Sequence, residues 1–279
     1  MTIFIFISFG WGLYDFTNSL TSSGSVDKLI VQAKGVGAPG LDSTFQLTDK
    51  DLKAIEKVNG VAEASGAYFK VAQIKKNNEQ IYSFIIAYDP ERPLIMEVSN
   101  LKILKGRMLQ KNDNEKVLLG YNYQDQGKIF DKPLNLNDKV EIQGQDLKII
   151  GFLDSVGNPQ DDAQIYITNN YLTKLYPGNN SYGYIVVKVN DINQIPRIIK
   201  EIEDKLRKSR GVEKGKEDFY VQSFDDLIAT YTNVLNILVG FIILIALISV
   251  LVSAINTANT MVTSVLERTK EIGIMKSIG

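Results

Sequence analysis

The chemistry open to this chain is limited by two residue types that it lacks. Its 279 residues include no histidine and no cysteine. Histidine is the usual general base of serine and cysteine hydrolases and the commonest ligand of zinc and other transition metals. An enzyme built on this sequence would have to rely on carboxylates, lysines or tyrosines. The absence of cysteine also suits a segment exposed to an oxidising exterior.

Two short segments could bind an ion. The adjacent carboxylates Asp161 and Asp162 could hold a divalent cation, but such pairs in loops are more often solvated, and we interpret them so. The glycine-rich stretch Gly35–Gly40 (GVGAPG) lacks the Lys-Ser/Thr pair of a phosphate-binding loop, and we interpret it as a turn. Neither segment indicates a metal site or a nucleotide site.

Two tyrosine pairs could line a binding surface. Tyr121 and Tyr123 form one pair, and Tyr182 and Tyr184 form the other. Alternating tyrosines on a strand more often pack with one face of a sheet than bind a ligand, so we favour packing. The sequence thus predicts no catalytic residues. The function has to be inferred from the helices, strands and apolar segments of the chain.

The longest apolar run lies near the C-terminus, from Leu235 to Ile255. As a helix, these residues would span about 30 Å, the thickness of the hydrocarbon core of a bilayer. Two aspartates precede the run, and Arg268, Lys270 and Lys276 follow it. By the positive-inside rule the C-terminal side is cytoplasmic. We therefore expect a transmembrane helix, with residues 22–225 outside the cell membrane.

An outer domain of this size needs an earlier crossing of the membrane. The candidate is Ile3–Leu13 (IFIFISFGWGL), which is too short to span a bilayer and lacks the basic start of a signal peptide. We expect residues 1–21 to be the outer part of a truncated first transmembrane helix. An interfacial or buried apolar N-terminus is the alternative.

The region between the apolar segments has the mixed pattern of an α+β domain. Alternation predicts a strand at 28–34, and Thr48 and Asp51 form a capping box at the start of a short helix. Two further strands, 67–74 and 80–88, flank a polar turn. This order predicts a β-α-β-β unit with its helix on one face of the sheet.

From residue 106 to residue 167 the pattern changes to short strands separated by Gly, Asn, Asp and Pro, which predicts a small all-β insert. A strand, an amphipathic helix after Asp191 and a final strand at 219–222 complete the first part of the domain. Ser223 and Asp226 form a second capping box, so one helix should begin near Phe224 and continue through the bilayer.

After the apolar run the chain ends in NTANTMVTSVLERTKEIGIMKSIG. The segment Glu267–Gly273 (ERTKEIG) resembles the hallmark of MacB/FtsX-type permeases of ABC transporters, in which the second membrane helix continues through an Asn-containing stretch into Glu-Arg-Thr-Arg/Lys-Glu-Ile-Gly. Leu104–Arg107 and Val117–Gly120 are similar to landmarks of the family's outer core. One departure is Asn137, where the family usually has glycine.

The resemblance implies an α+β extracytoplasmic domain between two transmembrane α-helices. Its parts would be a MacB-like core domain (22–222), a stalk with the second membrane helix of an FtsX-like permease domain (223–265), and the cytoplasmic start of a coupling region (266–279). Within the core, a β-α-β porter-like part (22–100 and 180–222) would enclose the inserted small all-β subdomain (101–179).

The function implied by the resemblance is that of a membrane permease subunit. It would couple ATP hydrolysis by a partner ATPase to movements of the outer domain, called mechanotransmission, and so export or extract a substrate. The chain itself would not be an enzyme and would hold no cofactor or metal, because ATP and magnesium would bind the partner. The residues expected to contact the ATPase are Glu267, Arg268, Lys270, Glu271, Ile272 and Lys276.

Three polar residues, Asn256, Asn259 and Thr260, follow the apolar run and are expected to pack against neighbouring membrane helices. Other expected partners are a second copy or a paired permease, membrane lipid, and an adaptor or substrate outside the cell. The net charge of -1 argues against nucleic acid. The expected location is the cell membrane, with a multi-pass full-length protein. Alternatives are an FtsX-like regulator of an extracellular cell-wall hydrolase and a membrane-anchored sensor or binding protein.

Overall fold

The computed structural model of the protein describes residues 4–5, 8–12, 15, 25–34, 46–178 and 181–279. Residues 23–227 form one compact unit, and residues 228–279 belong with the N-terminal segment to another. The glycine-rich stretch at 35–40 lies outside the described residues. Most of the expected first membrane helix lies outside them too, so that helix stays a prediction.

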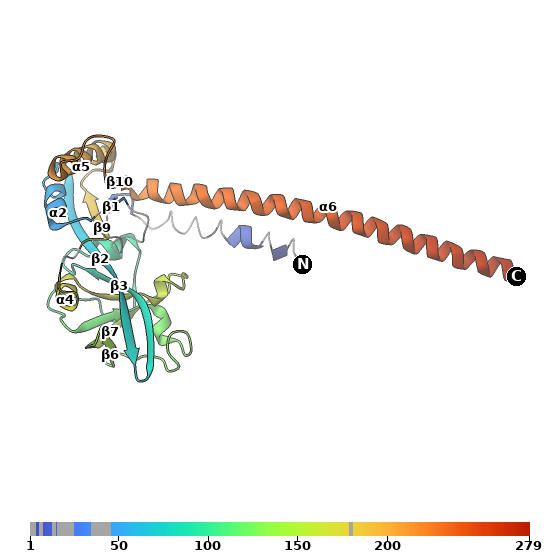
Figure 1. The fold of residues 1–279 in the computed structure, drawn as a ribbon, viewed down its shortest axis with the longest axis horizontal. Helices are drawn as coiled ribbons and strands as arrows, with labels where there is room; N and C mark the ends of the chain where they lie inside the picture. Colours follow the sequence, from blue (N-terminus) through green and yellow to red (C-terminus); the bar gives the residue numbers. More distant parts are fainter. Residues whose placement is uncertain (1–3, 6–7, 13–14, 16–24, 35–45, 179–180) are drawn as a thin grey trace. The chain divides into compact units, whose positions relative to one another are not determined.

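The first unit is an α+β domain with two lobes. One of them, named here the helical lobe, is an antiparallel sheet in the order β10-β1-β9-β2. Two helices cover one face of this sheet and lie side by side (Figure 1). The elements are β1 (Lys28–Ala33), α2 (Asp49–Ile55), the first half of β2 (Val61–Lys76), β9 (Tyr184–Val189), α5 (Ile195–Arg210) and β10 (Phe219–Ser223).

The other lobe, named here the β lobe, consists mainly of strands. Its sheet continues from β2 in the order β3-β8-β5-β7-β4, and β6 pairs with both β2 and β7. The β3–β8 and β5–β7 pairs are parallel. The elements are β3 (Glu79–Tyr88), β4 (Ile103–Gly106), β5 (Lys116–Leu119), η1 (Tyr121–Gln124), β6 (Lys139–Ile142), β7 (Gln145–Leu153), η2 (Asp161–Ala163), β8 (Ile165–Thr168) and α4 (Asn169–Leu175).

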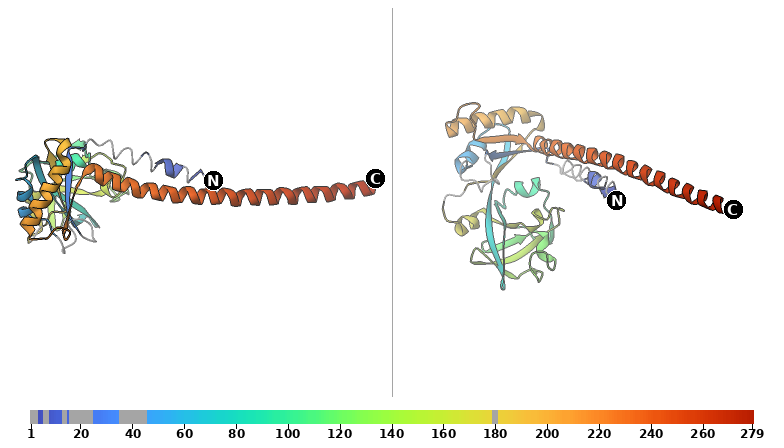
Figure 2. Two further views of the ribbon diagram at one scale, coloured as in Figure 1. Left: turned by 90° about the horizontal axis from the view of Figure 1, so that it is seen from above. Right: turned by 45° about the vertical axis from the view of Figure 1, so that its right-hand side comes forward.

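The two lobes share one long strand. Residues 61–67 of β2 pair with β9, and residues 68–76 pair with β3. The tip of the β2–β3 hairpin therefore points away from α2 and α5 (Figures 1 and 2). Asn77 at this tip has a φ of 54°, which asparagine tolerates better than most residues.

A second link between the lobes is the crossing segment, residues 89–101. It leaves β3 and contains α3 (Leu94–Val98), which contacts β2 and β9 before the chain enters β4. The α3 side chains Leu94 and Met96 are 1% and 3% exposed. A segment that begins and ends in the β lobe thus packs on the sheet of the helical lobe.

The helical lobe forms because its sheet and helices each have one apolar face. Leu29 and Val31 of β1 share a core with Ile198 and Ile202 of α5. The capping box predicted for α2 is present, with the Asp51 carboxylate accepting from the Thr48 backbone N–H at 2.8 Å.

Several sequence predictions need correction. Strand β3 hydrogen-bonds to β8 of the β lobe, whereas the sequence grouped it with the β-α-β part. Helices α3 and α4 were not predicted. Tyr121 and Tyr123 lie in the short 3-10 helix η1 and not on a strand. Tyr123 is buried and donates to the Ala163 carbonyl at 2.9 Å, so it serves packing.

The final element is α6 (Phe224–Ile278), a single helix of 55 residues. Its start has the predicted cap: the Asp226 N–H donates to Ser223 Oγ at 3.0 Å, and the two side chains bond at 2.6 Å. Among the described residues it is the one helix long and apolar enough to cross a membrane.

Candidate coupling helix and its anchor

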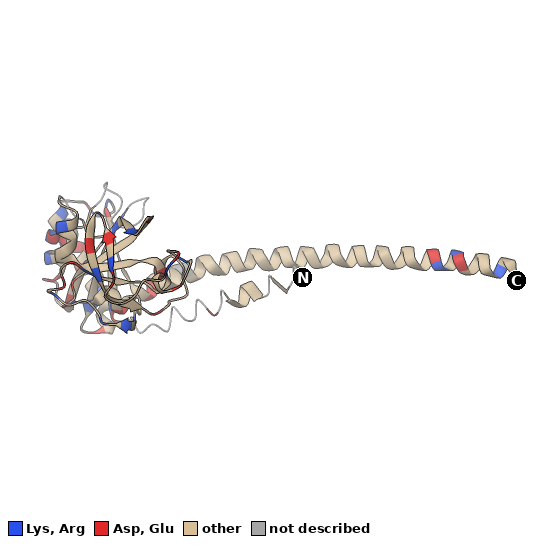
Figure 3. Ribbon diagram, turned by 90° about the horizontal axis from the view of Figure 1, so that it is seen from below, with Lys and Arg blue, Asp and Glu red and all other residues tan. Residues whose placement is uncertain are grey.

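Charged side chains are confined to the two ends of α6. Asp225 and Asp226 lie in its first turn, and the next charged residue is Glu267 (Figure 3). The Leu235–Ile255 run lies within this uncharged part, and its apolar side chains are mostly exposed in the isolated chain; Leu251, for example, is 64% exposed. Such a surface needs lipid or other apolar helices around it.

The start of α6 follows directly from an edge strand. Strand β10 ends at Ser223, α6 begins at Phe224, and β10 pairs along its length with β1. The ladder runs from the Leu29–Ser223 pair to the Ala33–Phe219 pair. The root of the helix is therefore held by backbone hydrogen bonds to the sheet of the helical lobe.

A buried arginine fastens the other end of β10. The Arg210 guanidinium, at the end of α5, donates to both carboxylate oxygens of Asp218 and, at 2.8 Å, to Asp51 of α2. It also donates to the Gln46 carbonyl at 3.0 Å. The Arg210 and Asp51 side chains are 15% and 2% exposed. The hydrogen bonds that Arg210 donates to Asp218 raise the pKa of Arg210, so this residue stays charged.

The Arg210 cluster, meaning Arg210, Asp51 and Asp218, thus joins three elements: the start of α2, the end of α5 and the entry to β10. A pocket of about 400 Å³ borders it. Each charged group of the cluster is paired within it, so we assign it a structural role. Sequence analysis identified Asp51 only as a capping residue, because its partner lies 159 positions away.

The three polar residues expected to pack membrane helices lie on one side of α6, three and four positions apart. The Thr260 hydroxyl donates to the Asn256 carbonyl at 2.9 Å, and the Asn259 carbonyl accepts from Thr263 at 2.9 Å. Within the described part of the chain, the side-chain amides of Asn256 and Asn259 make no hydrogen bond. These amides are free to bond with another helix.

The residues expected to contact an ATPase lie in the last turns of α6. Glu267, Arg268, Lys270, Glu271 and Lys276 form no ion pair among the described residues, although Glu267 and Lys270 are three positions apart. Between them lie exposed apolar side chains, of which Ile272 and Met275 are 52% and 63% exposed. The end of α6 therefore presents unpaired charges beside apolar groups, and its role as a contact surface stays a prediction.

Asp161 and Asp162 are not solvated as the sequence suggested. Asp162 is 6% exposed and accepts from Ser155 Oγ at 2.6 Å and from the Val156 N–H at 2.8 Å. Asp161 accepts from Asn158 and Gln164, and its burial raises its pKa. The described residues contain no group of three carboxylates that could hold a metal ion. Both aspartates organise the loop before β8.

The two glycine-containing landmarks have a steric explanation. A Cβ atom on Gly106 would lie 2.2 Å from the Ile150 carbonyl oxygen, and the φ of Gly106 is +82°. A Cβ atom on Gly120 would lie 2.4 Å from the Asp162 carbonyl oxygen. Only glycine fits where the backbones of two strands or loops approach so closely.

Comparisons with known proteins agree with the fold and with the helix. Residues 1–205 match the model of the MacB-like periplasmic core domain, and residues 226–279 match that of the FtsX-like permease C-terminal region. An uncharacterized ABC transporter permease of Methanocaldococcus jannaschii is 31% identical over 98% of this chain and 67% of its own length.

More distant relatives show the same similarity. The uncharacterized ABC transporter permease YknZ of Bacillus subtilis is 29% identical over 85% of this chain and 59% of its own length. The macrolide export ATP-binding/permease protein MacB of Neisseria gonorrhoeae is 27% identical over 93% of this chain and 40% of its own length. The chain thus spans between two fifths and two thirds of these relatives.

Two solved structures share the fold of the domain. The periplasmic region of MacB from Actinobacillus actinomycetemcomitans has a TM-score of 0.60 at 16% identity, over 76% of this chain and 95% of that one. The extracellular domain of YknZ from Gram-positive bacteria has a TM-score of 0.54 at 20% identity, over 70% of this chain and 99% of that one. With its MacB-like core domain and the FtsX-like helix that follows, the chain belongs to the MacB/FtsX family of ABC transporter permeases.

Proposed function

We propose that this chain is the part of a multi-pass cell-membrane permease that converts ATP hydrolysis on a separate ATPase subunit into movement of an extracytoplasmic domain. The observation that carries the proposal is the continuity of α6 from Phe224 to Ile278. One helix begins at the capped end of a domain strand and ends in the unpaired charged segment.

A long helix can transmit movement because its hydrogen bonds run along its axis. At about 1.5 Å per residue, α6 is about 80 Å long, more than twice the hydrocarbon thickness of a bilayer. No proline lies within it, so no site for a sharp kink is built in. A displacement of the charged end would therefore reach Ser223.

Contacts at the root of α6 would transmit such a displacement to the rest of the helical lobe. Strand β10 passes force to β1 through the ladder, and the Arg210 cluster passes it to α2 and α5. Lysine and arginine after the apolar run support a cytoplasmic location of the charged end by the positive-inside rule. The relatives from Methanocaldococcus jannaschii and Bacillus subtilis are named as permeases alone, which supports an ATPase on a separate subunit.

Movement of the outer domain would export or extract the substrate, and nothing would need to pass between the membrane helices. A paired permease or a second copy would supply the partner helix for Asn256 and Asn259, and the ATPase would supply ATP and magnesium. The chain would thus contribute neither a catalytic residue nor a metal ligand.

The test removes the charges at the end of α6. We expect the triple variant Glu267→Gln, Arg268→Gln, Glu271→Gln, in the full-length permease reconstituted with its ATPase in lipid nanodiscs, to lose most of the stimulation of ATP hydrolysis. The matched control is Glu201→Gln, Glu203→Gln, Lys205→Gln, which neutralises two glutamates and one cation on α5 of the domain.

The control should stimulate the ATPase as the unaltered permease does. Copurification of the ATPase with each variant separates loss of docking from loss of transmission. Full stimulation by the triple variant would refute the contact, and a hydrolase copurifying in place of a transport substrate would favour the regulator alternative.

A further inference from the structure

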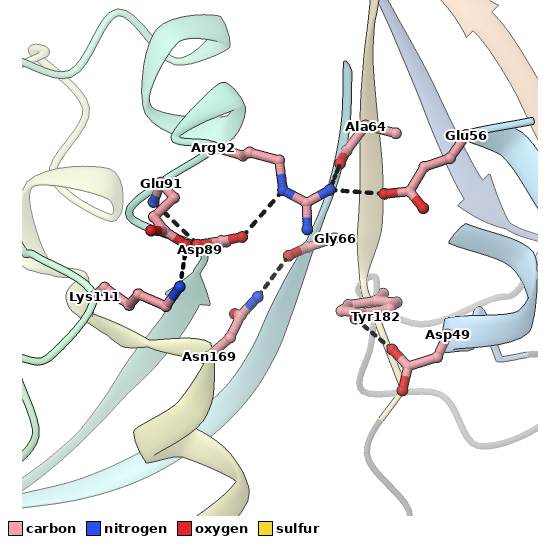
Figure 4. Close-up of polar contacts among 10 residues, drawn as sticks. All are labelled: Asp49, Glu56, Ala64, Gly66, Asp89, Glu91, Arg92, Lys111, Asn169 and Tyr182. Carbon is pink, nitrogen blue, oxygen red and sulfur yellow. Dashed lines mark hydrogen bonds and ion pairs between the residues drawn. The ribbon is translucent and has the colours of Figure 1, made fainter. Parts of the chain in front are cut away.

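The two lobes of the domain meet at a polar junction around the crossing segment (Figure 4). If the lobes were joined only by β2, the strand could bend there and the β lobe could lag behind the helical lobe. The contacts at the junction decide whether movement reaches the β lobe.

Arg92 of the crossing segment makes the main polar tie. Its Nη1 donates to Glu56 at 2.7 Å and to the Ala64 carbonyl at 2.8 Å, both in the helical lobe. Its Nε donates to Asp89 at 3.1 Å, at the exit of β3. One guanidinium thus bonds the start of the crossing segment, where the chain leaves β3, to two groups of the helical lobe, and its planar set of donors holds them in a fixed geometry.

A second tie comes from α3 itself. Lys28 of β1 is 5% exposed, and its ammonium pairs with Glu97 of α3 at 3.2 Å and with Asp27 at 2.9 Å. Between the two ties, Leu94 and Met96 are buried against the helical lobe. The crossing segment is therefore held by apolar packing with an ion pair at each side.

Two contacts reinforce β2 where it passes from one lobe to the other. Asn169, the first residue of α4, donates from Nδ2 to the Gly66 carbonyl at 3.1 Å. The Tyr182 ring stacks on Tyr68 at 4.4 Å, and its hydroxyl donates to Asp49 at 2.6 Å. A Cβ atom on Gly66 would lie 2.4 Å from the Tyr182 ring, so the glycine permits this stacking.

We propose that these ties make the two lobes one rigid body, and that Arg92 and Glu97 are positioning residues which pass movement of the helical lobe undiminished to the β lobe. The proposal deepens the proposed function, on which it rests for the source of the movement. Any bending would then occur outside the domain.

The test measures the distance between the lobes directly. These 279 residues contain no cysteine, so Lys200→Cys on α5 and Lys132→Cys in the β lobe introduce the two spin-labelling positions, and both positions are exposed. Any cysteine elsewhere in the full-length permease or in the ATPase is replaced by serine before labelling. The labelled full-length permease is assembled with its ATPase in nanodiscs and diluted with unlabelled permease. Pulsed electron double resonance then gives the distance distribution with and without ATP and vanadate.

We expect one narrow distribution in the unaltered permease, at the same distance in both nucleotide states. The variant Arg92→Gln, Glu97→Gln removes the ion pairs of Arg92 with Glu56 and Asp89 and that of Lys28 with Glu97. It leaves the apolar side of α3, so it should fold and show a broader distribution. The matched control Arg197→Gln, Glu201→Gln removes an ion pair inside α5 and should stay narrow.

Two results would overturn the proposal: two distances in the unaltered permease, or a distribution in the Arg92 and Glu97 variant as narrow as in the control. The comparison without nucleotide does not depend on coupling. If the ATPase is not stimulated at all, the proposed function fails while the width comparison still decides whether the lobes are tied.

Discussion

The domain and helix α6 differ in where their apolar and charged side chains lie. In the domain, apolar side chains are buried within the chain, and buried charges have partners: Asp51 has Arg210, and Lys28 has Glu97. In α6, apolar side chains such as Leu251 are exposed, and the charges of its last turns, from Glu267 on, form no ion pair with the residues that the structure describes. The domain is therefore stable through its own contacts, whereas α6 depends on lipid and on other proteins. Substitutions should separate these two regions.

The largest effect is expected at the Arg210 cluster. Arg210→Met would leave the buried Asp51 carboxylate without its cationic partner, which costs about 3–5 kcal/mol. The free energy of unfolding of the domain, from a urea titration in detergent followed by tyrosine fluorescence, should fall by this amount. Arg197→Met, which alters an exposed pair on the same helix, should change it little. Equal effects of both substitutions would contradict the structural role of Arg210.

A somewhat smaller loss is expected at Gly106. An alanine there has an unfavourable positive φ, about 1–2 kcal/mol, and a contact of 2.2 Å with the Ile150 carbonyl oxygen, about 1–3 kcal/mol more. Gly144→Ala is the matched control, because Gly144 has a φ of +77° but nothing within 4 Å. The difference between the two variants in the same titration measures the steric part, and a difference near zero would show that the strands can separate.

The domain should also lose stability in acid through Asp113. Hydrogen bonds from Arg107 at 2.5 and 2.9 Å, together with one from Lys116, hold the Asp113 pKa below its usual value. Because the folded pKa is lower than the unfolded one, the stabilisation is present above about pH 4 and is lost as the pH falls further. Asp113→Asn should cost about 2 kcal/mol at neutral pH and flatten the acid side of the stability curve. If the pH dependence of the unfolding free energy were the same in Asp113→Asn as in the unaltered protein, ionisation of Asp113 would not explain the acid sensitivity.

The smallest effect is expected in α6 itself. Asn256→Leu should leave unfolding of the domain unchanged and weaken helix association by about 0.6 kcal/mol, a typical value for one polar contact in a membrane. The dissociation constant of the permease pair in detergent measures it. Asn236→Leu, at the N-terminal end of the apolar run, is the control. If only the control weakened association, the partner helix would pack near Asn236 and not near Asn256.

Local signals in the sequence predicted the elements that depend on neighbouring residues. Thr48 with Asp51 and Ser223 with Asp226 predicted two helix starts, and alternation predicted a strand at 28–34, where β1 (Lys28–Ala33) lies. The prediction of secondary structure failed where a strand depends on pairing with a segment far away in the sequence. The start of β2, VAEASGA, has small residues with little strand preference, and it is a strand because β9 lies beside it. Helix α3 has only five residues, too few to show a helical period.

The candidate site shows the same limit. All of its predicted residues lie on α6, where the motif is continuous in sequence, and their roles stay predictions. The Arg210 cluster and the Arg92 tie were missed because Arg210 is 159 positions from Asp51 and Arg92 is 36 positions from Glu56. In a single sequence, no periodicity connects such pairs.

The uncharged part of α6 is longer than a bilayer requires. Residues 227–266 contain no charged side chain and extend over about 60 Å, whereas the hydrocarbon core is about 30 Å thick. The flanks on either side of Leu235–Ile255 are polar without being charged. A helix of this composition can slide along its axis by one turn, about 5 Å, without drawing a charge into lipid. Movement of the helix along its axis by one turn would therefore meet little electrostatic resistance from the membrane.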